Sequence, residues 1–83
     1  MEAEIYVMLK KTVADPQGLT VKHALESLGY GNIKEVRVGK LLTVRMDAKS
    51  KKEASAQLER MCSKLLANTI IENYSFKIRE DKR

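Results

Sequence analysis

The chain has 83 residues, a net charge of +5 from 16 Lys and Arg against 11 Asp and Glu, and a single cysteine. This length predicts one domain, residues 1–83, with little room for both a core and a deep substrate pocket, so an autonomous enzyme is disfavoured. One cysteine excludes an internal disulfide and a cysteine metal knuckle. No signal peptide is recognised and no apolar run approaches the ~20 residues that span a bilayer, so we expect a cytoplasmic protein without a membrane partner.

The first predicted strand covers residues 4–9, where apolar and other side chains alternate with a period of two. Asp15-Pro16 then predicts the start of a helix, because Asp is a strong N-cap and Pro is favoured at the first helical position. The helix is expected to run from about Pro16 to Leu28 and to end at Gly29. Its apolar stripe consists of Val21, Ala24, Leu25 and Leu28.

Residues 33–46 are expected to form a single long strand. The apolar residues Val36, Val38, Leu42, Val44 and Met46 all have even numbers, and a two-residue hairpin at Gly39-Lys40 would break that parity. We therefore predict a strand that is bent or bulged at Gly39 and overhangs a small sheet. An unpaired overhang is an edge that invites another subunit, so this strand is predicted to mediate dimerisation.

A second helix and a last strand complete the chain. Ser50 and Glu53 form a capping box, and the following helix is expected to end near Asn68. Its predicted core residues are Ala54, Leu58, Met61 and Leu65, with Cys62 as a further candidate. Residues 70–79 predict a strand with Tyr74, Phe76 and Ile78 on one face, and the tail at about 80–83 is expected to be frayed.

The predicted fold class is α+β, a two-layer β-α-β-α-β sandwich. Two helices are expected on one face of a mainly antiparallel sheet with a long central strand, and the sheet is expected to mediate dimerisation.

No reactive constellation is recognised. His23 is off the apolar stripe and is expected on the surface, while Cys62 is expected to pack as a small hydrophobic residue. One His, one Cys and isolated acids do not make a metal site, and no glycine pattern matches a phosphate loop. We expect no cofactor on this chain.

A small basic RNA-binding domain is the main alternative function, because α+β domains with exposed sheets often bind RNA by aromatic stacking. Aromatic residues are only 5% of this chain, and Tyr74 and Phe76 are more simply explained as core. No RNP sequence or GXXG loop is present, so nucleic acid is not expected as a partner.

Several segments in order resemble the PurS family, the small S subunit of phosphoribosylformylglycinamidine synthase in purine biosynthesis. The resemblance spans about residues 3–78 and departs from the family at Thr69, where many members have proline. The segments that carry it are Leu9-Lys10-Lys11, Asp15-Pro16-Gln17-Gly18, Ala24-Leu25, Leu28-Gly29-Tyr30, Val36-Arg37-Val38-Gly39-Lys40, Met61-Cys62, Lys64-Leu65-Leu66-Ala67-Asn68 and Ile71-Glu72-Asn73-Tyr74.

The resemblance implies a noncatalytic subunit that joins a large synthetase subunit to a glutaminase subunit and assists ammonia transfer. ATP and Mg²⁺ are then expected in the large partner, and this chain is expected to form a homodimer or higher homo-oligomer. Candidate partner contacts are Asp15, Pro16, Gln17, Gly18, Arg37, Gly39 and Lys40. Asp15, Pro16, Gly18 and Gly39 also have a purely structural explanation, whereas the long polar side chains of Arg37 and Lys40 favour a functional one.

Overall fold

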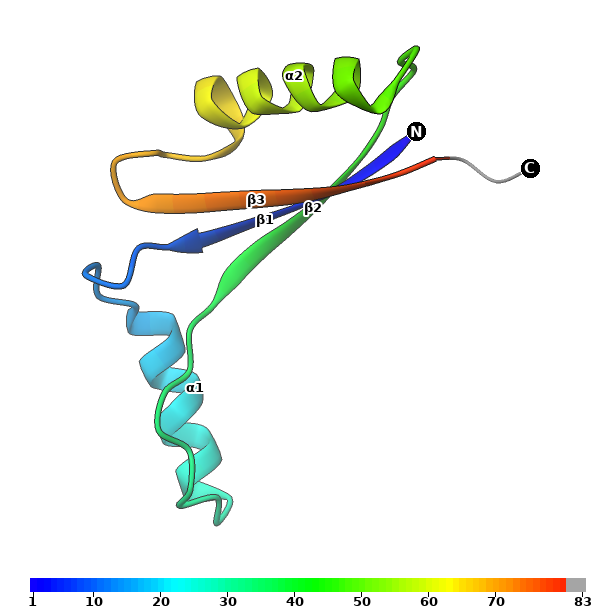
Figure 1. Cartoon of the computed structure of the whole chain (residues 1–83). Coiled ribbons are helices and arrows are strands. Elements are labelled where there is room, and N and C mark those ends of the chain that lie inside the picture. Colours follow the sequence, from blue (N-terminus) through cyan, green and yellow to red (C-terminus); the bar gives the residue numbers. More distant parts are fainter. Residues whose placement is uncertain (81–83) are drawn as a thin grey trace.

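The computed structural model describes residues 1–80 and has one antiparallel sheet. Its elements in chain order are β1 (Glu2–Leu9), α1 (Pro16–Ser27), β2 (Gly39–Arg45), α2 (Lys51–Met61), the π-helical turn η1 (Cys62–Leu66) and β3 (Glu72–Arg79). The strand order is β2-β1-β3, so β1 is central; it pairs with β2 from Glu2 to Met8 and with β3 from Glu2 to Leu9 (Figure 1). The predicted α+β class is confirmed.

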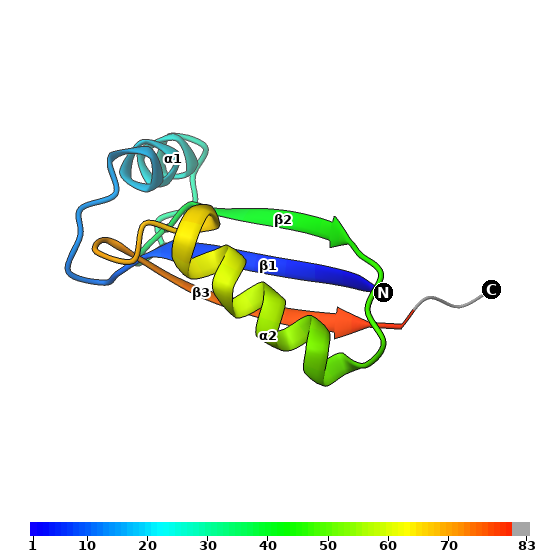
Figure 2. The same cartoon turned by 90° about the horizontal axis from the view of Figure 1, so that it is seen from above.

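The core lies between β1 and α2. Alternation along β1 directs Ala3, Ile5 and Val7 to one face, where each is at most 1% exposed. Seen from above, α2 crosses this face over β1 and β3 and leaves β2 to one side (Figure 2). Partly buried residues of β2 and β3, together with Met46 just after β2, extend the core on the same face: Leu42, Val44, Tyr74, Phe76 and Ile78. The predicted facing is confirmed for the last strand and for Leu42, Val44 and Met46, whereas Val36 and Val38 precede β2 and lie outside this core.

The second helix begins as predicted and ends differently. Ser50 Oγ accepts from Glu53 N at 3.1 Å, as a capping box requires. The prediction that Leu65 is buried is wrong, because its side chain is 82% exposed. The helix widens at its end into the π-helical turn, closed by the bond from Ala67 N to Cys62 O, and this turn places Cys62 and Leu66 against the core.

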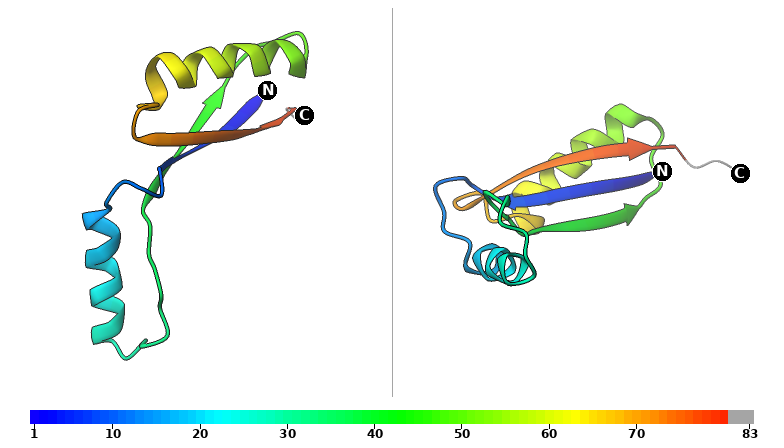
Figure 3. Two further views of the ribbon diagram at one scale, coloured as in Figure 1. Left: turned by 60° about the vertical axis from the view of Figure 1, so that its left-hand side comes forward. Right: turned by 90° about the horizontal axis from the view of Figure 1, so that it is seen from below.

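The first helix has the predicted bounds but does not cover the sheet. Figures 1 and 3 show α1 extending away from the strands, and within it only Gly18 is buried. Two stripe residues, Val21 and Leu28, are 39% and 74% exposed. The expectation of two helices on one face is therefore corrected to one, because α1 is held at its base against the returning chain and not folded over the core. The molecule is correspondingly elongated, 50 × 33 × 14 Å.

The long central strand is also corrected. Regular pairing of β2 begins only at Gly39, opposite Met8, and runs to Arg45, opposite Glu2, so β2 is a sheet edge. Residues 33–38 run beside α1 without sheet pairing (Figure 3). No hairpin forms at Gly39-Lys40, as parity predicted. Of the tail, Glu80 is exposed outside β3, and the rest of that prediction lies outside the described residues.

Candidate functional site

Most of the candidate residues meet where α1 joins the sheet. We call residues 11–37, which comprise α1 and its two flanking segments, the arm. We call the place where the arm meets the sheet the junction; it is formed by Asp15, Gly18, Arg37, Val38, Gly39 and Lys40. An open hollow of about 470 Å³ lies beside it, lined by Val7, Leu9, Asp15, Gln17, Val38, Gly39, Lys40 and Glu72. Pro16 is exposed at the first position of α1.

The Asp15 carboxylate ties the start of the arm to the start of β2. Its Oδ1 accepts from Gly18 N at 2.9 Å and caps α1, while its Oδ2 accepts from Val38 N at 2.7 Å. The bond from Val38 N–H, followed by that from Gly18 N–H, holds the pKa of this carboxyl below its ordinary value of 3.8, and the Arg37 charge adds to the effect. Asp15 is therefore an internal clamp as well as a helix cap.

Arg37 makes the second link at the junction. Its Nη2 donates to Lys10 O at 3.0 Å and to Val13 O at 2.8 Å, and the side chain is half-buried. Lys10 is itself fixed on the sheet side, because its N–H donates to Ile71 O at 2.8 Å. The end of the arm is thereby bonded both to the start of the arm and to the sheet.

Gly18 is a point of close approach within the junction. A Cβ at this position would overlap the carbonyl oxygen of Val36 and lie 2.8 Å from Asp15 Oδ2. A side chain would therefore push the returning segment away from α1. Gly39, opposite Met8 at the first pair of β2, is similarly tight, since its Cβ would lie 2.8 Å from Val7 O.

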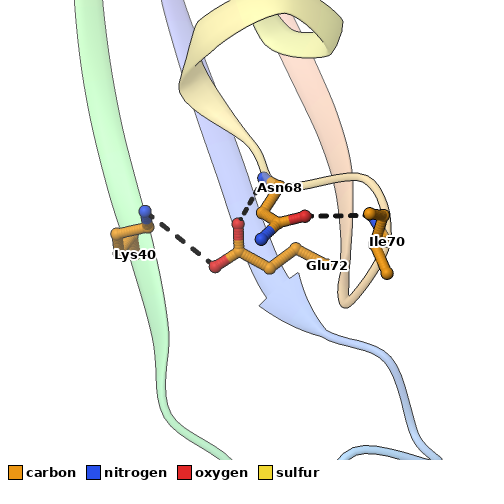
Figure 4. A network of polar contacts seen from close by, with 4 residues as sticks. All are labelled: Lys40, Asn68, Ile70 and Glu72. Atoms are coloured by element: carbon orange, nitrogen blue, oxygen red, sulfur yellow. Dashed lines mark hydrogen bonds and ion pairs between the residues drawn. The ribbon is translucent and has the colours of Figure 1, made fainter.

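Lys40 belongs to a polar network that joins β2 to the start of β3 (Figure 4). Its Nζ lies 4.0 Å from Glu72 Oε2, and Glu72 Oε1 accepts from Asn68 N at 2.7 Å. Asn68 Oδ1 in turn accepts from Ile70 N at 3.1 Å and shapes the turn before β3. We did not predict Asn68 and Glu72 as site residues, although both lie in segments that carry the family resemblance.

The remaining reactive side chains lie away from the junction. Cys62 is fully buried in the core, and this burial raises the pKa of its thiol, which favours the protonated form. His23 is exposed on α1, as predicted. Within residues 1–80, no group of three or more His, Cys, Asp or Glu side chains could hold a metal ion. In the same range no helix is long and apolar enough to cross a membrane.

The sheet face opposite α2 offers little for base stacking. Tyr74 and Phe76 pack toward the core on the other side. The open face instead pairs opposite charges, with Arg79 Nη2 2.6 Å from Glu4 Oε2. Lys77 Nζ lies 5.9 Å from the Tyr6 ring centroid, which covers one side of that ring with a cation. The RNA-binding alternative therefore finds no support at this face.

The Asp15 clamp gives a pH prediction. Because the folded-state pKa is lowered, the clamp stabilises the fold above the unfolded pKa, and this stabilisation is lost as pH falls through the folded pKa, below 3.8. Asp15→Asn should be less stable than wild type at neutral pH, and the difference should shrink at the acid end. Urea unfolding of both chains between about pH 3 and pH 7 measures this. A difference that stays constant over this range would contradict the assignment.

The fold and the junction define a class: a small α+β domain in which α2 covers one face of an open sheet and α1 is held outside it as part of an arm. The family profile described as PurS, phosphoribosylformylglycinamidine (FGAM) synthase, matches residues 2–80. The chain belongs to the PurS family of FGAM synthase.

Curated relatives and solved structures agree with this assignment. PurS subunits of FGAM synthase from Synechocystis and Bacillus subtilis are 47% and 42% identical, over 89% and 95% of this chain and 74% and 93% of theirs. The crystal structure of Methanocaldococcus jannaschii PurS superimposes with a TM-score of 0.88 at 36% identity, covering 98% of both chains. A chain in the structure of PurLQS from Thermotoga maritima does so with 0.84 at 28% identity, covering 92% of this chain and 93% of that one.

Proposed function

We propose that this chain is the noncatalytic small subunit of a three-component FGAM synthase, where it bridges the large synthetase subunit and the glutaminase subunit. The observation that carries the proposal is the likeness over nearly the whole chain to a chain of PurLQS from Thermotoga maritima. The Methanocaldococcus jannaschii relative is likewise described as one subunit of formylglycinamide ribonucleotide amidotransferase. The complex is proposed to operate in the cytoplasm.

The chemistry is assigned to the partners. The glutaminase subunit releases ammonia from glutamine, and the large subunit uses ATP and Mg²⁺ to activate the amide of formylglycinamide ribonucleotide. Ammonia then replaces the amide oxygen, giving formylglycinamidine ribonucleotide, ADP, phosphate and glutamate. The part proposed for this chain is to hold the two active sites in an arrangement that delivers ammonia. No chemical step is assigned to Asp15 or Arg37, because both are engaged in bonds to the chain's own backbone.

Self-association is part of the proposal. Large apolar side chains along the arm are uncovered in the single chain, including Leu19 at 52%, Leu28 at 74% and Tyr30 at 54% exposure. The edge strand β2, which begins at the base of the arm, offers unpaired backbone groups along its outer edge. For a chain of this size, a second copy would supply buried apolar area that a single core lacks. We therefore propose a homodimer or higher homo-oligomer that covers the arm.

Sedimentation equilibrium tests this self-association. Leu28→Lys should weaken the oligomer by about tenfold or more, because it places a charge in an apolar contact. Ser27, the exposed neighbour, lies outside the apolar stripe, so Ser27→Lys adds the same charge and should change the stability of the oligomer little. A monomeric wild type at low micromolar concentration, or equal effects of the two substitutions, would contradict the proposed interface.

A further inference from the structure

We infer that Asp15 and Arg37 are positioning residues, which together fix the direction of the arm relative to the sheet and so set where the arm meets other subunits. The inference rests on the proposed assembly function. It also assigns these two side chains a different role from the direct partner contact predicted from the sequence.

The arm depends on its base for its orientation. Figures 1 and 3 show α1 projecting from one end of the sheet, and it makes no extensive packing with any other described helix or strand. Only two backbone connections enter the arm, one after β1 and one before β2. Two unlinked connections could rotate together about the base, since such hinges absorb motion at a few element-terminal residues.

Asp15 and Arg37 link the two connections from opposite sides. Asp15, at the start of the arm, accepts from Val38 N, 23 residues later. Arg37, at its end, donates to Lys10 O and Val13 O, 27 and 24 residues earlier. The two side chains use separate backbone partners, so three hydrogen bonds from two residues join the connections. Charge-assisted bonds of this kind are shorter and stronger than neutral ones.

The same bonds leave these side chains poorly placed to bind a partner. Both carboxylate oxygens of Asp15 already accept backbone N–H groups, and Arg37 Nη2 already serves two carbonyls while the side chain is half-buried. Two uncovered apolar side chains, Leu28 and Tyr30, lie at the far end of the arm, beyond α1. Asp15 and Arg37 therefore affect contact with a partner indirectly, by fixing the direction in which α1 points.

A small rotation at the base of the arm produces a large displacement at its far end. A helix of 12 residues is about 18 Å long, so a rotation of about 20° at its base moves its end by about 6 Å. Such a displacement exceeds a side-chain contact distance, and apolar contacts made by the end of the arm would be lost. The contact surface can thus be intact in a variant that no longer assembles.

Distance measurements between spin labels test the positioning role directly. Labels at Ser27→Cys in α1 and Ser75→Cys in β3 report the angle of the arm, while the buried Cys62 stays unlabelled. Excess unlabelled chain restricts the signal to pairs within one molecule. Arg37→Met and Asp15→Asn should each broaden the distance distribution roughly twofold or more, and Arg37→Lys, which keeps one donor group, should be intermediate. Lys34→Met removes a charge from the same segment and is the matched control.

The labelled variants are then assembled with the large and glutaminase subunits, with circular dichroism confirming that each is folded. We expect Arg37→Met to show a broadened distance distribution together with about tenfold weaker assembly. Lys34→Met should show neither change. Unchanged distance distributions in Arg37→Met and Asp15→Asn would overturn the inference, as would broadened distributions with unchanged assembly. If wild type itself fails to assemble, the proposed function fails, while the distance distributions still decide whether the two side chains fix the arm.

Discussion

Replacing Leu58 by alanine is expected to lower the free energy of unfolding by about 2–5 kcal/mol, because Leu58 is among the largest fully buried side chains. Leu58 is fully buried on α2 and contacts the central strand's apolar face. A domain of this length has a total stability of only about 4–12 kcal/mol. The substitution therefore removes a large fraction of the stability, which urea or thermal unfolding followed by circular dichroism measures.

Leu65→Ala is the matched control for this prediction. Leu65 lies seven residues farther along the same helical segment but is 82% exposed, because η1 rotates it away from the core. Removing it from a single chain should change stability by less than about 0.5 kcal/mol. Equal losses at the two positions would contradict the packing described for α2 and would restore the straight helix expected from the sequence.

Replacing Gly18 by alanine is the second substitution with a large expected effect. Helix propensity alone predicts a gain of about 0.5–1 kcal/mol for Ala over Gly within a helix. The structure predicts the opposite sign, because the new Cβ would overlap Val36 O and crowd Asp15 Oδ2. Overpacking of this kind costs about 1–3 kcal/mol and would displace the Asp15 clamp from Val38. Loss of stability and weaker assembly with the partner subunits are therefore expected together.

Gly31→Ala provides the comparison for Gly18→Ala. Gly31 lies in the arm beyond α1, and a Cβ there would meet no other atom within 4 Å. The same substitution should leave both stability and assembly close to wild type. If Gly18→Ala stabilises the chain, the close contact described between Gly18 and Val36 is wrong, and helix propensity determines the effect of the substitution.

Local signals predicted most of the elements. The Asp15-Pro16 start of α1, the Ser50 cap of α2 and the alternation of β1 each depend on neighbours within a few residues, and the structure reproduces them. Gly29, with φ of 100°, follows the helix end as expected. Parity likewise assigned Leu42 and the following even-numbered residues of β2 to the core face.

The features that were missed depend on contacts between distant residues. An amphipathic stripe shows that α1 has an apolar face, but does not show whether its own sheet covers that face. The direction of α1 depends on bonds such as those from Arg37 to Lys10 and Val13, which join positions more than 20 residues apart. The π-helical turn at Cys62 likewise requires tertiary packing, because the residue spacing before it fits an ordinary helix.

In the candidate site, too, several residues could be predicted from the sequence but their long-range contacts could not. Sequence reasoning selected Asp15, Gly18 and Arg37, and the structure brings all three together at the junction. It did not predict that Asp15 would bind the Val38 backbone or that Arg37 would bind those of Lys10 and Val13, since side-chain type alone does not distinguish an internal bond from a partner contact. Asn68 and Glu72 were missed because a single Asn and a single Glu carry no spacing signal of their own.

Reconstitution of glutamine-dependent synthesis tests the central claim most directly. Purified large and glutaminase subunits are assayed for formylglycinamidine ribonucleotide formation with and without this chain, using either glutamine or ammonium chloride as the nitrogen source. We predict that adding the chain raises the glutamine-dependent rate about tenfold or more and changes the ammonia-dependent rate little, because free ammonia needs no delivery from the glutaminase. An unchanged glutamine-dependent rate would contradict the account.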